Sequence, residues 1–396
     1  MTEEEVERQL SRLFDAAVGD PPQPVTLGGI RHLIVVRRTV VAISATIAIV
    51  LAGCVGLVVS ANAAGPAPAS GHRQTAGPPA HYFQQAYGHS LTEVIRSTPT
   101  GAVTGTVRCP WAGSELVTVV AAPGNFFMSC VKYVPGSQTE VIGTRLYSFG
   151  LTRSGRPKGY VPVKGGNLPG LFPAGLAVSE DGSVLAANVW TNPQGAKPEV
   201  IVITTSTGAH AVWRYSGFPD GWIFSAGDLS LSGDGQELAI AGVRHCPEGD
   251  HACHSPGPAM YEVSHATKGG DLGTGRLVYK QAQITSSPDG QIINSYLSPD
   301  GRTAIATVVS GDGRPGSGYV SVVLLSASTG KPIRTLYKLP TGKSFFYWFV
   351  TMDPTGKYIL FNAGPNGNNT RNGWIDNGKL VPLKPAIGTK VAYEAW

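Results

Sequence analysis

Short runs of apolar and β-branched residues, separated by glycine-containing turns, recur along the last two-thirds of this chain. In one type of unit, an Asp-Gly or similar turn joins two such runs. Its copies are LAVSEDGSVLAANV, LSLSGDGQELAIAG, SYLSPDGRTAIATV and VTMDPTGKYILFNA, with turn glycines at Gly182, Gly235, Gly301 and Gly356. Self-similarity at intervals of 53, 66 and 55 residues predicts a repeat architecture.

A second recurrent turn, Thr-Gly or Ser-Gly, follows the first and also joins two β-rich runs. It occurs at Gly101, Gly155, Gly208 and Gly330, with degenerate copies at Gly270 and Gly378. Gly124 adds a fifth member to the first type. Glycine suits these positions because tight hairpins need a positive φ. Two hairpins in series form a four-stranded antiparallel sheet, which is one blade of a β-propeller.

The two types of turn are unequal in number, six against five. The first outer hairpin, residues 86–108, therefore has no inner strand before it in the chain. The C-terminal segment IGTKVAYEAW is the candidate for that strand, and its pairing would close the ring without an unpaired edge. We predict an all-β, six-bladed propeller over residues 82–396, with seven or five blades as alternatives.

A 22-residue segment without charges, residues 39–60, predicts a transmembrane helix. At about 1.5 Å per residue it is long enough for a bilayer core of about 30 Å. Arg31, Arg37 and Arg38 precede it, whereas only Arg73 follows closely, so we expect the N-terminus in the cytoplasm. Residues 1–38 are then cytoplasmic, residues 61–81 form a Pro/Ala/Gly linker, and the propeller is extracytoplasmic.

Three other signals near this segment are compatible with processing. The LAGC box ends at Cys54, which would be lipidated, ANA at 61–63 matches a signal-peptidase site, and RR at 37–38 loosely resembles a twin-arginine signal. An uncleaved anchor is the preferred interpretation, and every alternative exports the same domain.

A short amphipathic helix is predicted before the anchor. Thr2 and Glu5 form a capping box, and apolar residues follow at helical spacing. This helix can rest on the membrane, pair with a copy of itself, or bind a cytoplasmic partner.

The alternation of Ser-x-Asp-Gly and Thr-Gly turns resembles the TolB-type and WD-repeat-like β-propellers of bacterial exported proteins. The resemblance covers residues 82–396. It implies that a face of the ring binds a protein or ligand more often than it catalyses a reaction. The plan of an anchor followed by a propeller also resembles actinobacterial single-pass membrane proteins.

The charge balance limits the expected partners. The chain has 31 Lys and Arg against 26 Asp and Glu, and its formal net charge is +5. Because we find no basic cluster in the sequence, we expect no nucleic-acid partner. Weak attraction to anionic surface polymers remains compatible with this balance.

Four cysteines in the exported part favour disulfides, because export places them in an oxidising environment. We expect Cys109 to pair with Cys130 and Cys246 with Cys253, although three connectivities are formally possible. The second pair lies in a segment that could instead bind zinc. The alternative metal ligands are His245, Cys246, His251, Cys253 and His254.

Other motifs give weak chemical signals. GDGRPG at 311–316 satisfies G-x-G-x-x-G, but a strand-like run follows it and not a helix, so we interpret it as a loop. The turn residues Asp181, Asp234 and Asp300 are better explained by hairpin chemistry than by calcium binding. No G-x-S-x-G elbow, H-E-x-x-H helix or P-loop occurs in the sequence.

These observations predict a non-catalytic binding or scaffolding module without catalytic residues or a cofactor. Its partner would be an extracytoplasmic protein, peptide or glycan. Two alternatives stay open: a hydrolase or lyase with its site in the propeller channel, and a transmembrane sensor that signals through the N-terminal helix.

Overall fold

The computed structural model describes residues 78–86, 93–137, 140–190, 198–215, 222–244, 258–284, 291–310, 318–340, 346–365, 371–383 and 391–395. No helix within these ranges is long and apolar enough to cross a membrane. The predicted anchor at 39–60 and the predicted N-terminal helix lie outside the described residues.

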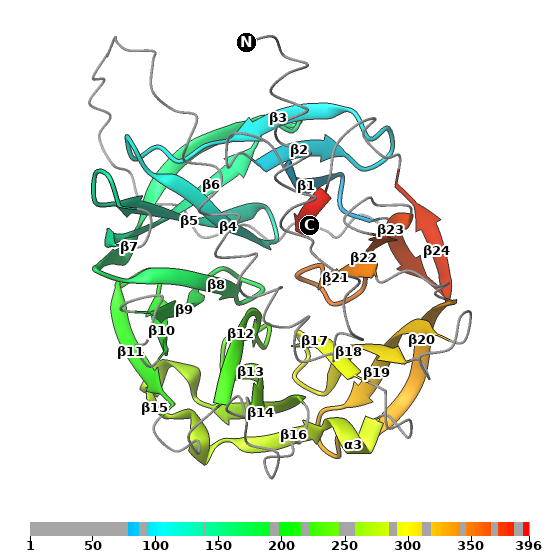
Figure 1. Ribbon diagram of the computed structural model, residues 1–396. Coiled ribbons are helices and arrows are strands. Elements are labelled where there is room, and N and C mark those ends of the chain that lie inside the picture. Colours follow the sequence, from blue (N-terminus) through cyan, green and yellow to red (C-terminus); the bar gives the residue numbers. More distant parts are fainter. Residues whose placement is uncertain are drawn as a thin grey trace, which may run out of the picture. The chain divides into compact units, whose positions relative to one another are not determined.

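The first three blades follow one another in the chain and around the ring (Figure 1). Blade 1 consists, from one edge of its sheet to the other, of β25 (Val391–Ala395), β1 (His81–Ala86), β2 (Glu93–Ser97) and β3 (Val103–Val107). Blade 2 consists of β4 (Glu115–Ala122), β5 (Asn125–Tyr133), β6 (Val141–Leu151) and β7 (Pro157–Pro169). Blade 3 consists of β8 (Phe172–Val178), β9 (Val184–Trp190), β10 (Glu199–Thr204), β11 (Ala209–Arg214) and the two-residue β15 (Gly270–Asp271).

The other three blades complete the circle. Blade 4 consists of β12 (Trp222–Leu231), β13 (Glu237–Arg244), β14 (Pro258–Ser264) and β16 (Arg276–Lys280). Blade 5 consists of β17 (Gln291–Leu297), β18 (Thr303–Ser310), β19 (Tyr319–Ser326) and β20 (Pro332–Pro340). Blade 6 consists of β21 (Phe346–Met352), β22 (Ile359–Pro365), β23 (Arg371–Asp376) and β24 (Lys379–Pro382). A four-residue helix, α3 (Gln281–Ile284), follows β16.

The ring is closed by the C-terminal strand, as the unequal number of turns predicts. β25 pairs antiparallel with β1, with Phe83 opposite Ala395 and Gln84 opposite Glu394. The sequence interpretation missed β1, which precedes the first outer hairpin and is the second strand of its blade. Blade 1 therefore combines three strands from the beginning of the propeller with one from its end, and the prediction of six blades is confirmed.

In the described residues, the buried apolar side chains form six clusters, one between each pair of neighbouring blades. Because a blade packs on both faces, its inner strands read as continuous apolar runs; β9, for example, is buried over six successive residues. The outermost strand β20 is mostly exposed by contrast. The smallest cluster joins blades 6 and 1 through Tyr82, Leu360 and Leu383.

The predicted turn glycines lie where the hairpins need them. Ten of them have φ between 65° and 81°; they are Gly101, Gly124, Gly155, Gly182, Gly208, Gly235, Gly301, Gly330, Gly356 and Gly378. The prediction of a tight hairpin at Gly270 is wrong, because this glycine lies in β15 with a φ of 151°. The ten tight turns connect the first strand of a blade to the second, or the third strand to the fourth. We call the end of the propeller where these turns lie the turn face.

The Asp residues of the turns act locally, as predicted. The carboxylate of Asp181 accepts hydrogen bonds from the Ser179 hydroxyl at 2.7 Å and from the Ser183 amide at 2.9 Å. The carboxylate of Asp234 accepts from the Ser232 hydroxyl and the Gln236 amide in the same way, at 2.6 and 3.0 Å. A carboxylate that bonds its own turn fixes the hairpin without any ion.

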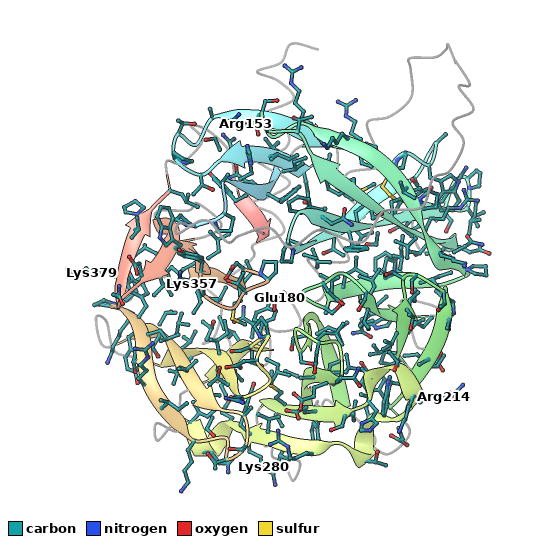
Figure 2. All side chains as sticks on the ribbon, turned by 180° about the vertical axis from the view of Figure 1, so that it is seen from behind. Arg153, Glu180, Arg214, Lys280, Lys357 and Lys379 are labelled. Atoms are coloured by element: carbon teal, nitrogen blue, oxygen red, sulfur yellow. A yellow bond between two sulfur atoms is a disulfide. The ribbon has the colours of Figure 1, made fainter. Side chains whose placement is uncertain are left out.

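Neighbouring turns are also bonded to one another around the ring. The amide of Glu180 donates to the carbonyl of Gly233 at 2.9 Å, and the amide of Gly233 donates to the carbonyl of Pro299 at 2.6 Å. Figure 2 shows Glu180 near the centre of the ring, with Arg214 and Lys280 on its rim. Backbone hydrogen bonds therefore connect blades 3, 4 and 5 close to the propeller axis.

A disulfide joins Cys109, in the connection from blade 1 to blade 2, to Cys130 on β5 (Figure 2, yellow bond). Cys130 is completely buried. The bond closes a loop with a sequence separation of 21 residues. The second predicted pair, Cys246 and Cys253, lies outside the described residues.

Replacing both Cys109 and Cys130 by Ser is expected to lower the free energy of unfolding by about 3 kcal/mol, because the unfolded chain regains the freedom of the closed loop. Denaturant titration measures the change. The same titration of the Cys246→Ser/Cys253→Ser variant separates the effect of the Cys109–Cys130 bond from the effect of losing the other predicted cysteine pair. An unchanged midpoint for the Cys109/Cys130 variant would show that this bond does not stabilise the fold.

Candidate functional site

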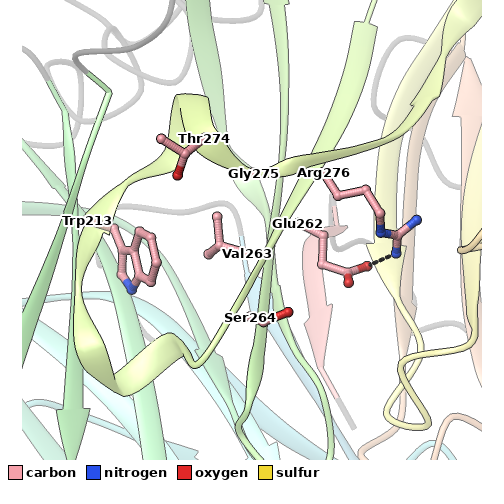
Figure 3. A pocket seen from close by; sticks show the side chains of 7 residues that line it. All are labelled: Trp213, Glu262, Val263, Ser264, Thr274, Gly275 and Arg276. Carbon is pink, nitrogen blue, oxygen red and sulfur yellow. Dashed lines mark hydrogen bonds and ion pairs between the residues drawn. The ribbon is translucent and has the colours of Figure 1, made fainter.

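A pocket of about 260 Å³ lies on the turn face, where blade 4 meets blade 3 (Figure 3). It is lined by Trp213, Glu262, Val263, Ser264, Thr274, Gly275 and Arg276. Trp213 belongs to the outer strand of blade 3, whereas the other residues belong to blade 4 or to the connection between its third and fourth strands. Polar and charged side chains form most of this lining.

The pocket exists because blade 4 interrupts the repeat. In other blades a tight glycine turn joins the third and fourth strands, but here residues 265–275 form two short 3-10 turns, η1 (Ala266–Lys268) and η2 (Leu272–Thr274), with β15 between them. β15 pairs in parallel with β11 of blade 3, through Trp213 opposite Gly270 and Arg214 opposite Asp271. The connection therefore reaches across to the neighbouring blade.

Local hydrogen bonds shape this connection. His265 begins it with a φ of 61°, a left-handed conformation that few non-glycine residues adopt. The Asp271 carboxylate accepts from the Gly273 amide at 2.8 Å, and the Thr274 hydroxyl donates to the Asp271 carbonyl at 2.7 Å. A Cβ on Gly269 would lie 2.8 Å from the Val212 carbonyl oxygen, so only glycine permits this close approach.

Trp213 forms one wall and is held in a fixed orientation. Its side chain is almost completely buried, and its indole N–H donates to the Ala266 carbonyl at 2.6 Å. Gly270 lies against the six-membered part of the ring, where an added Cβ would be 3.1 Å from Cζ3. The indole thus fastens the connection of blade 4 to blade 3.

The opposite wall carries an ion pair. Glu262 is buried, with 6% of its side chain exposed, and one carboxylate oxygen lies 2.7 Å from Nη2 of Arg276, which is 44% exposed (Figure 3). The other terminal nitrogen of Arg276 donates to the carbonyl of Ala327 in blade 5. Arg276 thus pairs with the Glu262 carboxylate in blade 4 and is also bonded to blade 5. The ion pair offsets the cost of burying the negative charge of Glu262.

Further carboxylates surround the ion pair. The pKa of Glu237 is raised by burial and by the nearby negative charges of Glu262 and Asp234, and Arg276 partly offsets this effect. The pKa of Asp234 is lowered by hydrogen bonds from the Ser232 hydroxyl and the Gln236 amide. The region around the pocket is therefore rich in hydrogen-bond acceptors and has an excess of negative charge.

This arrangement can recognise a ligand that both donates and accepts hydrogen bonds. The Ser264 and Thr274 hydroxyls, the Glu262 carboxylate and the half-exposed guanidinium are all at the pocket wall. Such a mixed lining fits the hydroxyls of a sugar or the amides of a peptide, which both donate and accept.

Several predicted site residues lie outside the described residues. They are the alternative metal ligands His245, Cys246, His251, Cys253 and His254, and the glycine-rich loop at 311–316. Within the described ranges, no group of three or more His, Cys, Asp or Glu side chains is arranged to hold a metal ion. The sequence interpretation did not identify the pocket, although the degenerate repeat around Gly270 was a signal that blade 4 departs from the pattern.

The strand pairing and the closing strand define the class of the protein: it is a six-bladed β-propeller. No protein-family model matches the chain, and no curated protein matches it. TolB-like and WD40-type propellers are among its structural neighbours.

Three solved structures illustrate this likeness. A candidate TolB from Agrobacterium tumefaciens has 17% identity and a TM-score of 0.35, over 58% of this chain and 66% of that one. The Cps50 (Swd1) β-propeller domain of Myceliophteria thermophila has 13% identity and a TM-score of 0.40, over 74% and 80%. The acylaminoacyl peptidase of Pyrococcus horikoshii has 11% identity and a TM-score of 0.39, over 68% of this chain and 39% of the peptidase. Similarity at this level concerns the fold alone.

Proposed function

We propose that this chain is an exported propeller, anchored by residues 39–60, which binds a protein, peptide or glycan outside the cytoplasm and does not catalyse a reaction. Two features support the proposed location. The apolar segment is long enough to span a bilayer, and Arg residues precede it. The Cys109–Cys130 disulfide is typical of proteins that fold in an oxidising compartment.

The pocket on blade 4 carries the proposed binding role. A propeller needs only a tight turn at this position, and five blades have one. A longer connection that is fixed by an indole, a parallel strand pair and an inter-blade guanidinium is more than the fold requires. Irregular segments on a rigid scaffold are where binding residues are most often found. The paired carboxylate of Glu262 suits recognition better than proton transfer, for which an acid or base should be free to change its charge.

A photo-crosslinking experiment tests this proposal. A photoreactive amino acid at Thr274, in the pocket, is expected to capture a discrete partner in intact cells. The same amino acid at Thr329, an exposed residue of the tight turn in blade 5, is the matched control and is expected to capture none. Protease added to the intact cells is expected to remove the propeller and the crosslinked product together.

The readouts separate the parts of the proposal. A propeller protected from protease until the cells are lysed would contradict the exported location. Equal crosslinking at Thr274 and Thr329, or none at Thr274 with the protein folded, would contradict a binding role for the pocket. Turnover of a captured ligand would contradict the non-catalytic role.

A further inference from the structure

Positive charge is concentrated on blade 2, contrary to our expectation of no basic cluster. Residues 103–170 contain seven Lys and Arg but only two carboxylates, Glu115 and Glu140. The basic residues are Arg108, Lys132, Arg145, Arg153, Arg156, Lys158 and Lys164. This segment alone thus has an excess of positive charge as large as the net charge of the whole chain. Among the described residues, none of the seven forms an ion pair.

Two of these cations share one aromatic ring. The guanidinium carbon of Arg145 lies 4.3 Å from the centre of the Trp111 ring, and Nζ of Lys132 lies 5.5 Å from the same ring. Each distance is within the range of a cation–π interaction. One indole therefore attracts two cations, although like charges repel each other. We call Trp111, Lys132 and Arg145 the Trp111 cluster.

The disulfide and the strand register build this cluster. Cys130 lies directly opposite Arg145 in the β5–β6 ladder, and Lys132 is two residues further along the same face of β5. The bond from Cys130 to Cys109 holds the connection that contains Trp111 against this face. The position of this connection is fixed further by the Lys132 ammonium, which donates to the Ala112 carbonyl at 3.1 Å. The Ser114 hydroxyl also donates to the Trp111 carbonyl, at 2.6 Å.

The nearby carboxylates do not neutralise the cluster. Glu115 is opposite Val131, so the alternation of side chains places it on the other face of the sheet from Cys130 and Lys132. There, burial of the Tyr133 side chain raises the pKa of its hydroxyl, and the negative charge of Glu115 adds to this effect. Glu140 is exposed just before β6 and forms no ion pair among the described residues. Two preorganised cations that have no counter-charge within the described part of the chain attract an anion.

We propose that the Trp111 cluster on blade 2 is a binding site for a phosphate group. A guanidinium that is stacked on an aromatic ring keeps its N–H groups in a fixed plane, and their fork matches two oxygens of a tetrahedral oxyanion. The ammonium of Lys132, which contacts the same indole, supplies a second charge. This site is separate from the pocket on blade 4 and does not depend on the function proposed for that pocket.

The test uses the full chain in detergent and measures binding of long-chain polyphosphate by calorimetry. Arg145→Gln is expected to weaken binding about tenfold, and Lys132→Gln about threefold to tenfold. Arg145→Lys, which keeps the charge but loses the fork, should be intermediate. Arg153→Gln is the matched control with the same change of charge on the rim of the propeller (Figure 2), and we expect less than a twofold effect. All three side chains that these variants change are exposed or partly exposed, so the variants should fold.

Two outcomes would overturn the proposal. One is no saturable binding of polyphosphate at about 1 mM or below, and the other is equal losses for Arg145→Gln and Arg153→Gln, which would indicate a general charge effect. The same calorimetry with inorganic phosphate and with a glycerophosphodiester, which has the chemistry of a lipid headgroup, then shows whether the bound phosphate belongs to a lipid or is free. Preference for the diester supports a lipid phosphate, and preference for polyphosphate or inorganic phosphate supports a free phosphate. Tighter binding of polyglutamate than of every phosphate probe would reject phosphate as the ligand class.

Discussion

Replacing Glu93 by Gln is expected to raise the free energy of unfolding by about 3 kcal/mol at pH 7. Glu93 lies on β2 and is 5% exposed. It shares a sheet face with Ile95 and is paired with Val107, and both belong to the apolar cluster between blades 1 and 2. Its Oε2 has no hydrogen-bond partner among the described residues. Burial raises the pKa of this carboxyl to about 8.

The sign of the effect follows from the number of bound protons. Between pH 4.5 and about 8 the folded state keeps the Glu93 proton, whereas the unfolded state has lost it. Stability therefore falls as the pH rises through this range. Glutamine has the same shape and no charge, so the variant should lack this decline. The two proteins should differ by less than about 1 kcal/mol at pH 5 and most above pH 8.

Denaturant titrations at pH 5, 7 and 8.5 check this prediction. Glu140→Gln is the control, because that side chain is exposed, and we expect a change within about 0.5 kcal/mol at each pH. If the free energy of unfolding changed with pH in the same way for Glu93→Gln and for the wild-type protein, the assignment of a neutral, buried Glu93 would be contradicted.

Deleting residues 390–396 is expected to lower the stability of the propeller by about 5 kcal/mol, which is comparable with the whole stability of a marginal domain. The deletion removes β25, so β1 loses the partner that closes the ring. The exposed edge of β1 then becomes a template for pairing with another chain. We expect aggregation in size-exclusion chromatography and loss of a single cooperative thermal transition.

A peptide with the sequence KVAYEAW provides the matched test of this prediction. Added to the truncated protein, it is expected to restore part of the thermal transition, whereas a scrambled peptide should have no effect. A truncated chain that stays monomeric and melts at the original temperature would show that β25 is not needed for closure.

The sequence predicts the fold well because its strongest signals are local. A glycine at a tight turn, such as Gly182 or Gly235, is required by the backbone of four consecutive residues, and its spacing counts the blades. The closing strand was predictable from the numbers of the two kinds of turn. β1 was missed because neither of the two recurrent turn motifs, Asp-Gly or Thr-Gly, borders the segment HYFQQA in the sequence.

The sites could not be predicted in the same way, because they depend on contacts between distant residues. Trp111 and Arg145 meet only when a disulfide holds the connection before β4 against the β5–β6 ladder. Trp213 reaches the pocket only because β15 pairs with a strand of the preceding blade. Sequence showed that the repeat around Gly270 was irregular, but not which residues the irregular segment would contact.

Closure by the last strand has a consequence for biosynthesis. The ribosome makes β1 early and β25 at the end, so the first blade has to wait for its fourth strand while nearly all the rest of the propeller is synthesised. At about 5–20 residues per second this delay lasts tens of seconds. During that time the nascent chain exposes an incomplete sheet, and a chaperone that covers strand edges would have its substrate there. A prematurely terminated chain can never hide this edge, which gives quality-control proteases a simple means of recognising it.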